Sequence, residues 1–164
     1  MHSPVNSPVH RLMQAGRLDR FFIDGDWVMP DGRDRFAVVS PSTEDTLCEI
    51  PLGNAHDADR AVQAARHAFE RWSATSPQER AVLLDRIRAL MLERAELFAT
   101  ALALEMGAPL GYARGAHVPL AAEHIRVARD NLARYPFVER RGTTAVAREP
   151  IGVCALITPW NWPI

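Results

Sequence analysis

The sequence contains no lysine, and all 19 of its basic residues are arginine. These 164 residues therefore supply neither the lysine of a phosphate-binding loop nor the lysine amine of a Schiff base. They also lack the apolar stretch of about 7–15 residues that a signal peptide carries near its N-terminus. No run is long and apolar enough to cross a bilayer. We therefore expect a cytoplasmic protein without a membrane partner.

Cysteine is also scarce, with only Cys48 and Cys154 in the chain. Two distant cysteines form no disulfide framework and no Cys-x-x-Cys site. Both lie in apolar, strand-like stretches, so each is predicted to be a small buried hydrophobic residue. The formal net charge of -1 gives no reason to expect nucleic acid or an anionic membrane as a partner.

An unbroken apolar run occupies residues 151–157. A short run that is apolar on both alternations is typical of a strand covered on both faces, as in a parallel sheet. Pro159 has no N–H to donate to a sheet, so the strand should end near Thr158. Ligands of open parallel sheets bind beyond the carboxyl ends of the strands, where residues 158–162 would lie. A parallel partner needs a crossover of about a dozen residues, and none follows. The sequence thus predicts an α/β fold that is cut off after its first parallel strand.

The residues before this run predict hairpins followed by helices. Asp24-Gly25 is a strong two-residue turn signal between apolar residues, so 21–28 should form a β-hairpin. Ser76-Pro-Gln-Glu79 is a helix start, with Ser at the N-cap, Pro at the first position and Glu at the third. Further strands are expected over 36–40, 46–50 and 143–148, and helices over 57–73, from Ser76, over 95–105 closed by Gly107, and from Pro119 to Pro136.

The segment 158–163, Thr-Pro-Trp-Asn-Trp-Pro, has the most chemical promise. Two prolines fix φ on either side of the Trp-Asn-Trp centre, and two indoles supply rigid packing area. An amide held this firmly, that of Asn161, is suited to donating hydrogen bonds to an oxyanion, because it needs no particular protonation state. The alternative is a structural asparagine that satisfies its own turn while the tryptophans fill the core.

Two other patterns carry weaker chemical signals. Histidines recur at helical spacing, but no third ligand stands at a metal-binding spacing, so surface histidines are favoured and no metal site is predicted. Glycines recur every fourth residue, but no strand precedes them, so helix termination and close packing explain them better than phosphate binding. The residues concerned are His56, His67, His117 and His124, and Gly107, Gly111 and Gly115.

With these motifs in order, the chain resembles the N-terminal part of the NAD(P)-dependent aldehyde dehydrogenase superfamily. The resemblance covers residues 21–164 and implies an N-terminal fragment of that α/β fold. The motifs that carry it are Phe22-Ile-Asp-Gly-Asp-Trp27, Ser40-Pro-Ser-Thr43, Asp59-Arg-Ala-Val62, Arg148-Glu-Pro-Ile-Gly-Val153 and Pro159-Trp-Asn-Trp-Pro163.

The resemblance implies a mechanism in which a cysteine thiolate attacks an aldehyde, hydride is transferred to NAD or NADP, and water releases a carboxylic acid. Asn161 matches the amide that holds the oxyanion, and Ile157, Thr158, Pro159 and Trp160 match residues that line the cofactor pocket. The nucleophilic cysteine, the glutamate base and the nucleotide-binding loop fall later in the family's sequence. Cys154 lies inside the predicted strand and is not the nucleophile, so the chain alone is expected to be inactive.

Residues 1–20 lie outside the resemblance and are expected to be a flexible tail. The resemblance implies three further parts and a set of partners: 21–142 would be the hairpins and helices of the cofactor-binding domain, 143–150 an oligomerisation-type strand, and 151–164 the first parallel strand with the active-site turn. The expected partners are a small-molecule aldehyde and, at full length, further copies of the chain in a homo-oligomer. Two alternatives stay open: a fragment of a CoA-acylating semialdehyde dehydrogenase, and a non-catalytic oligomerisation or interaction module.

Overall fold

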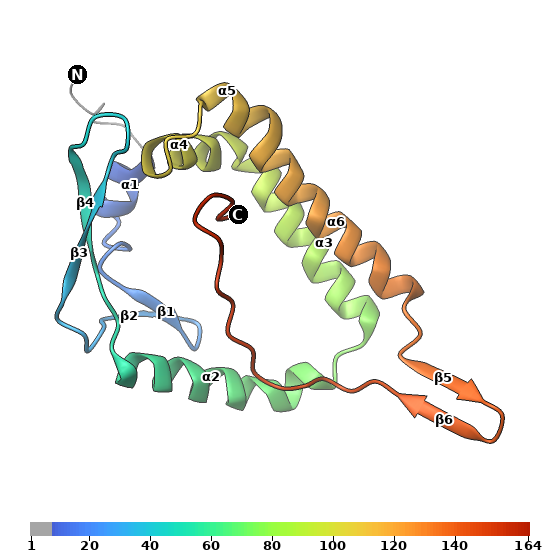
Figure 1. Cartoon of the computed structure of the whole chain (residues 1–164). Helices are drawn as coiled ribbons and strands as arrows, with labels where there is room; N and C mark the ends of the chain where they lie inside the picture. The colour runs from blue at the N-terminus through green and yellow to red at the C-terminus, as the bar shows by residue number, and fades with distance from the viewer. Residues whose placement is uncertain (1–7) are drawn as a thin grey trace.

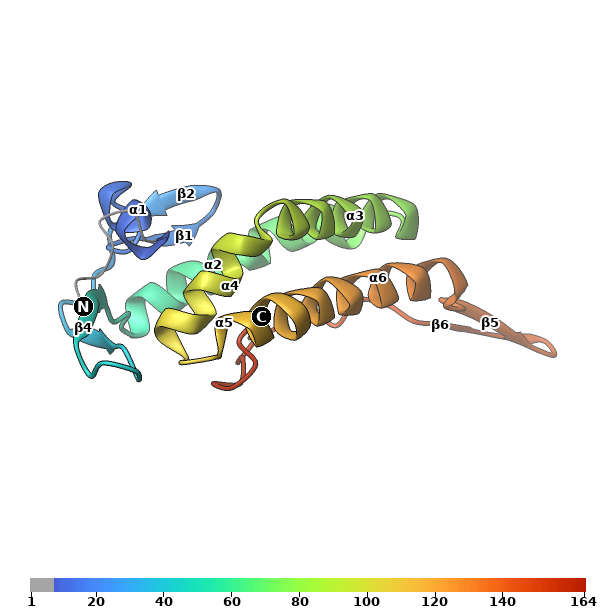
Figure 2. The same ribbon diagram turned by 90° about the horizontal axis from the view of Figure 1, so that it is seen from above.

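A computed structural model describes residues 8–164, in which two short antiparallel hairpins lie at one end of the helices and a third lies at the other end (Figures 1 and 2). Residues 148–164 follow the last strand without helix or strand. The elements are α1 (Pro8–Gln14), β1 (Phe21–Ile23), β2 (Asp26–Val28), β3 (Arg35–Val39), β4 (Thr46–Pro51), α2 (Ala55–Ser73), α3 (Pro77–Glu93), α4 (Ala95–Glu105), α5 (Leu110–Tyr112), the π-helix η1 (Ala113–His117), α6 (Val118–Arg134), β5 (Val138–Arg141) and β6 (Thr144–Ala147).

The first hairpin forms as predicted. Strands β1 and β2 pair antiparallel, with Phe21 opposite Val28. The turn residues Asp24 and Gly25 have φ values of 54° and 86°. Positive φ at both central positions is what a two-residue turn needs if its twist is to match that of the strands. The predicted strands over 36–40 and 46–50 also form, as β3 and β4, and shift by a residue or less at each end.

Helix α3 begins and helix α4 ends where the capping residues in the sequence predict. Helix α3 begins after Ser76, whose side chain accepts a hydrogen bond from the Glu79 backbone, while the Glu79 carboxylate accepts one from the Ser76 backbone. Helix α4 ends before Gly107, which has a φ of 77°. The ring of Pro41 would lie 2.7 Å from a Cβ at this position, so glycine also lets the turn after β3 pack closely.

Helix α6 begins at Val118, beside Pro119, and ends at Arg134, as predicted, and two short elements that were not predicted, α5 and η1, precede it. The helical turns continue from α5 through the π-helix η1 into α6. The Val118 backbone N–H donates to the carbonyl of Ala113, five residues back. A proline inside an α-helix removes one hydrogen bond and clashes with the carbonyl four residues before it. The wide π-turn just ahead of Pro119 relieves this conflict, so helical turns continue on the amino side of α6.

Helices α3 and α6 run side by side in opposite directions, and α4 packs against η1 at one end of this pair (Figures 1 and 2). An exposed ion pair links the two long helices, with Arg129 Nε 3.1 Å from an oxygen of Asp85. Residues 148–164 run back through the middle of the view in Figure 1 toward the start of α6. The buried core lies where α4, η1 and α6 meet and consists of Ala99, Leu102, Ala108, Ala113 and Val118, with Phe98 and Ile164 partly buried against it.

The strand predicted over 151–157 is absent, and so is a parallel sheet within residues 8–164. The segment is extended, but no strand in the described part of the chain pairs with it. Without a partner its N–H and C=O groups cannot form a ladder. The side chains of Ile151, Leu156 and Ile157 are 93%, 89% and 96% exposed. Cys154 is exposed as well, so the expectation that it is buried is wrong, whereas Cys48 is buried as predicted.

A short helix forms within residues 8–20, part of the segment that was predicted to be a flexible tail. Pro8–Gln14 form α1, which lies beside α4. Asp19 accepts a hydrogen bond of 2.7 Å from Arg35, and Arg20 donates one of 3.1 Å to the Trp27 carbonyl. Charged side chains thus connect this segment to the hairpins. The remainder of the predicted tail, residues 1–7, lies outside the described residues. No helix between residues 8 and 164 is long and apolar enough to span a membrane.

Candidate functional site

The candidate site is the turn at Trp160–Asn161, which ends the extended segment. Pro159 and Pro163 restrict φ on either side of it. The residues from Ile157 to Asn161 are all exposed, and the Trp160 side chain is 86% exposed. The turn therefore presents polar and aromatic groups on the surface, near α5 and η1, which Trp162 contacts.

Trp162 anchors the turn to the helices. Its indole stacks on the imidazole of His117, with ring centroids 3.9 Å apart and planes 5° from parallel. It also lies edge-on to Tyr112, with centroids 6.4 Å apart, and Tyr112 meets His117 edge-on at 5.2 Å. Ile164 packs against the core. The carboxyl side of the turn is thus held by an aromatic cluster, while the amino side is free of such contacts.

The side chain of Asn161 is exposed and makes no hydrogen bond to any residue of the described structure. Sequence reasoning left two roles open for it, an oxyanion donor and a structural asparagine that satisfies its own turn. A structural role would use the amide within the turn. In the structure the amide is available to an external acceptor, on a turn whose backbone is restricted by two prolines.

The residues predicted to line a cofactor pocket are Ile157, Thr158, Pro159 and Trp160. Ile157 is 96% exposed, so this stretch offers apolar surface and one indole face. Its backbone forms no hydrogen bond within residues 8–164, which leaves its N–H and C=O groups available to a ligand. These features fit one wall of a dinucleotide site. No charged side chain occurs between Cys154 and Ile164, so this wall has no cationic group for a pyrophosphate.

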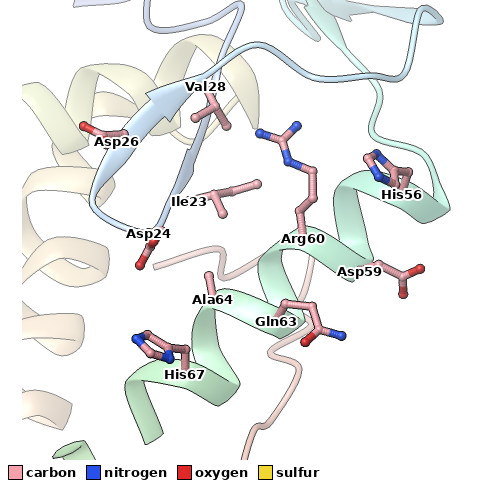
Figure 3. A pocket seen from close by; sticks show the side chains of 10 residues that line it. All are labelled: Ile23, Asp24, Asp26, Val28, His56, Asp59, Arg60, Gln63, Ala64 and His67. Carbon is pink, nitrogen blue, oxygen red and sulfur yellow. The ribbon is translucent and has the colours of Figure 1, made fainter.

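A separate open pocket of about 590 Å³ lies between the β1–β2 hairpin and α2 (Figure 3). His56, Asp59 and His67 line it, and none of residues 157–163 does. His56 Nδ1 forms a hydrogen bond with a carboxylate oxygen of Asp31. No group of three or more histidine, cysteine or acidic residues in the described part of the chain could hold a metal ion. The pocket therefore shares no lining residue with the candidate turn.

His117 is the residue that sequence reasoning missed. It was classed among the surface histidines, but it is only 3% exposed, and its Nδ1 is buried without a hydrogen-bond partner in the described structure. No local sequence signal distinguishes it from the exposed histidines, because its burial depends on contacts with Tyr112 and Trp162. His56, His67 and His124 are exposed, as predicted.

Most of this chain is similar in sequence to known proteins. Residues 27–164 match the aldehyde dehydrogenase family. A 3-succinoylsemialdehyde-pyridine dehydrogenase from a Pseudomonas species is 44% identical over 145 residues, which are 88% of this chain and 30% of that protein. A putative aldehyde dehydrogenase from Staphylococcus aureus is 39% identical over 142 residues, with 87% and 30% covered.

Solved structures show the same relationship. A mutant of aldehyde dehydrogenase C from Pseudomonas syringae, complexed with NAD+ and octanal, superposes with a TM-score of 0.88 at 54% identity, covering 90% of this chain and 30% of that one. An aldehyde dehydrogenase from Mycobacterium tuberculosis, complexed with NAD+, superposes with a TM-score of 0.75 at 31% identity, covering 80% and 29%. The chain therefore spans about 30% of the length of these relatives.

Proposed function

Because the chain belongs to the aldehyde dehydrogenase family, we propose that it contributes the N-terminal part of an enzyme that oxidises an aldehyde to a carboxylic acid with NAD+ or NADP+. The relatives it matches are dehydrogenases, and two of the matched structures are complexed with NAD+. The reaction adds a thiolate to the aldehyde carbonyl, removes a hydride and hydrolyses the resulting thioester. The bound dinucleotide supplies the hydride acceptor.

Within this reaction, Asn161 donates an amide N–H to the oxygen that becomes negative when the thiolate adds. A neutral donor held in place before the reaction stabilises this charge without reorganisation. The observation that carries the proposal is the exposed Asn161 amide, free of partners in the described structure, on a turn anchored through Trp162. Ile157 to Trp160 form one wall of the dinucleotide site through their backbone, apolar surface and the Trp160 indole.

Neither cysteine of the chain serves as the nucleophile in this proposal. Cys48 is buried on β4, and burial together with the nearby Glu105 and Asp19 carboxylates raises the pKa of its thiol, which disfavours the thiolate. Cys154 is exposed, but it lies seven residues before Asn161 on an extended segment without secondary structure, so nothing holds its thiol against the amide. The nucleophile and the base come from outside these 164 residues.

The proposal also includes assembly into a homo-oligomer in the cytoplasm. The β5–β6 hairpin projects beyond the end of α6 (Figures 1 and 2). All four residues of β6 are exposed, including Val146, and neither strand of the pair meets a third strand within residues 8–164. Such an edge can extend a sheet of another copy.

A chimaeric enzyme tests the proposed function. Residues 1–164 replace the matching segment of the Pseudomonas syringae aldehyde dehydrogenase, which is 54% identical. We expect NADH or NADPH formation with aldehydes and release of the free acid. A folded chimaera without activity would favour a non-catalytic module.

The 164-residue chain alone is the matched control. It should form no NADH or NADPH with the same aldehydes. If it does and the activity is lost in Cys154→Ala, the assignment of the nucleophile to another segment is wrong.

A further inference from the structure

We propose that His117 is a positioning residue for Asn161, acting through a stack between its imidazole and the indole of Trp162. The inference rests on the proposed function, because it assigns a role to a second residue in the same site. His117 and Trp162 lie 45 positions apart in the sequence, and Asn161 directly precedes Trp162.

The stack joins the turn to the helical layer. The two rings lie 3.9 Å apart and within 5° of parallel, and the imidazole is almost fully buried. Tyr112 closes the cluster edge-on against both rings. Flat contact between two planar rings restricts the tilt of the indole as well as its distance. A restraint on Trp162 passes directly to the peptide that joins it to Asn161.

The backbone at His117 is unusual in a way that serves this contact. His117 is the last residue of η1, a π-helical turn between α5 and α6. A π-turn adds one residue to a helix and rotates the side chains that follow it, and such turns occur often at functional sites. The turn also lies directly before Val118 and Pro119, so the helix departs from regular geometry where His117 meets the candidate site.

The polar atoms of His117 do not explain its burial. Nδ1 is buried without a partner in the described structure, and a buried polar atom without a hydrogen bond costs stability. The face of the ring makes the contact, and its nitrogens do not. A phenyl ring should therefore preserve the restraint, whereas a leucine fills a similar volume without a flat face.

Spectroscopy on the 164-residue chain tests the contact directly. Trp27→Phe, Trp72→Phe and Trp160→Phe leave Trp162 as the only tryptophan. We expect His117→Leu to increase quenching of Trp162 fluorescence by acrylamide, and His117→Phe to leave it near the parent value. Thermal melts followed by circular dichroism show whether each variant keeps the helical layer. Equal quenching in folded His117→Leu and parent chains overturns the proposal.

Kinetics of the chimaeric enzyme test the consequence for catalysis. Loss of an aromatic pair should reduce the population of the positioned turn, and with it kcat, by about 2- to 10-fold. KM for the dinucleotide should not change in His117→Leu, and His117→Phe should restore kcat. If Asn161→Ala lowers kcat and His117→Leu does not, the positioning role is wrong while the proposed function stands. If Asn161→Ala also leaves kcat unchanged, the proposed role of Asn161 itself fails.

Discussion

Asn54 and Asp57 exchange two hydrogen bonds at the start of α2. The Asp57 backbone N–H donates to Asn54 Oδ1 and the Asn54 backbone N–H donates to Asp57 Oδ2, each over 3.1 Å. The same carboxylate accepts from the backbone N–H groups of Asp31 and Gly32, over 2.9 and 3.0 Å. One buried carboxylate therefore caps α2 and attaches the loop after β2 to it.

We predict that Asp57→Ala lowers the melting temperature of the chain. The change leaves the Asp31, Gly32 and Asn54 N–H groups without their acceptor and removes half of the capping box. Asp59→Ala is the matched control, because Asp59 is an exposed acid on the same helix. The measurement is the loss of helical circular dichroism on heating. Equal effects of the two substitutions would contradict a specific role for Asp57.

The Asp57 cap should also make stability depend on pH. Hydrogen bonds from the Asp31 backbone, followed by those from Gly32 and Asn54, hold the pKa of the Asp57 carboxyl below its usual range. A lowered folded-state pKa contributes stability that is fully present above the unfolded pKa of about 3.9 and is lost as pH falls through the folded value. Urea unfolding between neutral pH and about pH 3 should show this loss, and Asp57→Asn should reduce it. An identical pH dependence in the variant would exclude Asp57 as the source.

Ser76→Ala should destabilise the start of α3. Ser76 Oγ accepts the Glu79 backbone N–H at 3.2 Å, and replacing such an N-cap residue with alanine typically costs about 1 kcal/mol. Ser73→Ala is the control, since Ser73 is the last residue of α2 and its hydroxyl only donates to the Glu70 carbonyl. Urea titrations of both variants give the difference in unfolding free energy, and a Ser76→Ala value no larger than the control would count against the cap.

The exposed apolar segment should make the 164-residue chain prone to association. Ile151, Leu156 and Ile157 are almost fully exposed on a segment that pairs with no strand of the described structure. Contiguous apolar surface and unpaired backbone both favour aggregation. We expect Leu156→Asp with Ile157→Asp to reduce binding of a hydrophobic dye and to shift the chain toward monomer in sedimentation, with the helical melt unchanged. A parent chain that is already a monodisperse monomer without dye binding would refute this prediction.

Asn161→Ala should lower kcat of the chimaeric enzyme by about 10²–10³-fold, the usual effect of losing one oxyanion donor. Affinity for NAD+ should change little, because the dinucleotide wall is formed by Ile157 to Trp160. Asn161→Asp should be slower than Asn161→Ala, because a carboxylate repels the developing oxyanion instead of donating to it. Steady-state kinetics with NAD+ titration separate these effects. A near-normal kcat combined with lost folding or lost cofactor binding would assign Asn161 a structural role.

Short-range signals in the sequence were enough for most of the helices and hairpins. Asp24-Gly25 forms the turn of the first hairpin, and Ser76 and Glu79 form the capping box of α3. Gly107 follows the end of α4. Each of these features lies where it was expected. Each feature depends on the conformations of a few neighbouring residues, so its physical cause lies within the local sequence. The same reasoning placed the start of α6 near Pro119, but it missed the helical turns of α5 and η1 on the amino side of the proline, where a π-helix accommodates the ring.

The amino-acid pattern also pointed to the turn around Asn161, since two prolines and two tryptophans mark it without any knowledge of the fold. What holds that turn required the tertiary structure. His117 was indistinguishable in sequence from the exposed histidines, because burial depends on which segments meet in space. Whether residues 151–157 form a strand likewise depends on more than their own sequence. An apolar run becomes a strand only where a partner offers hydrogen bonds, and no strand among residues 8–164 does so.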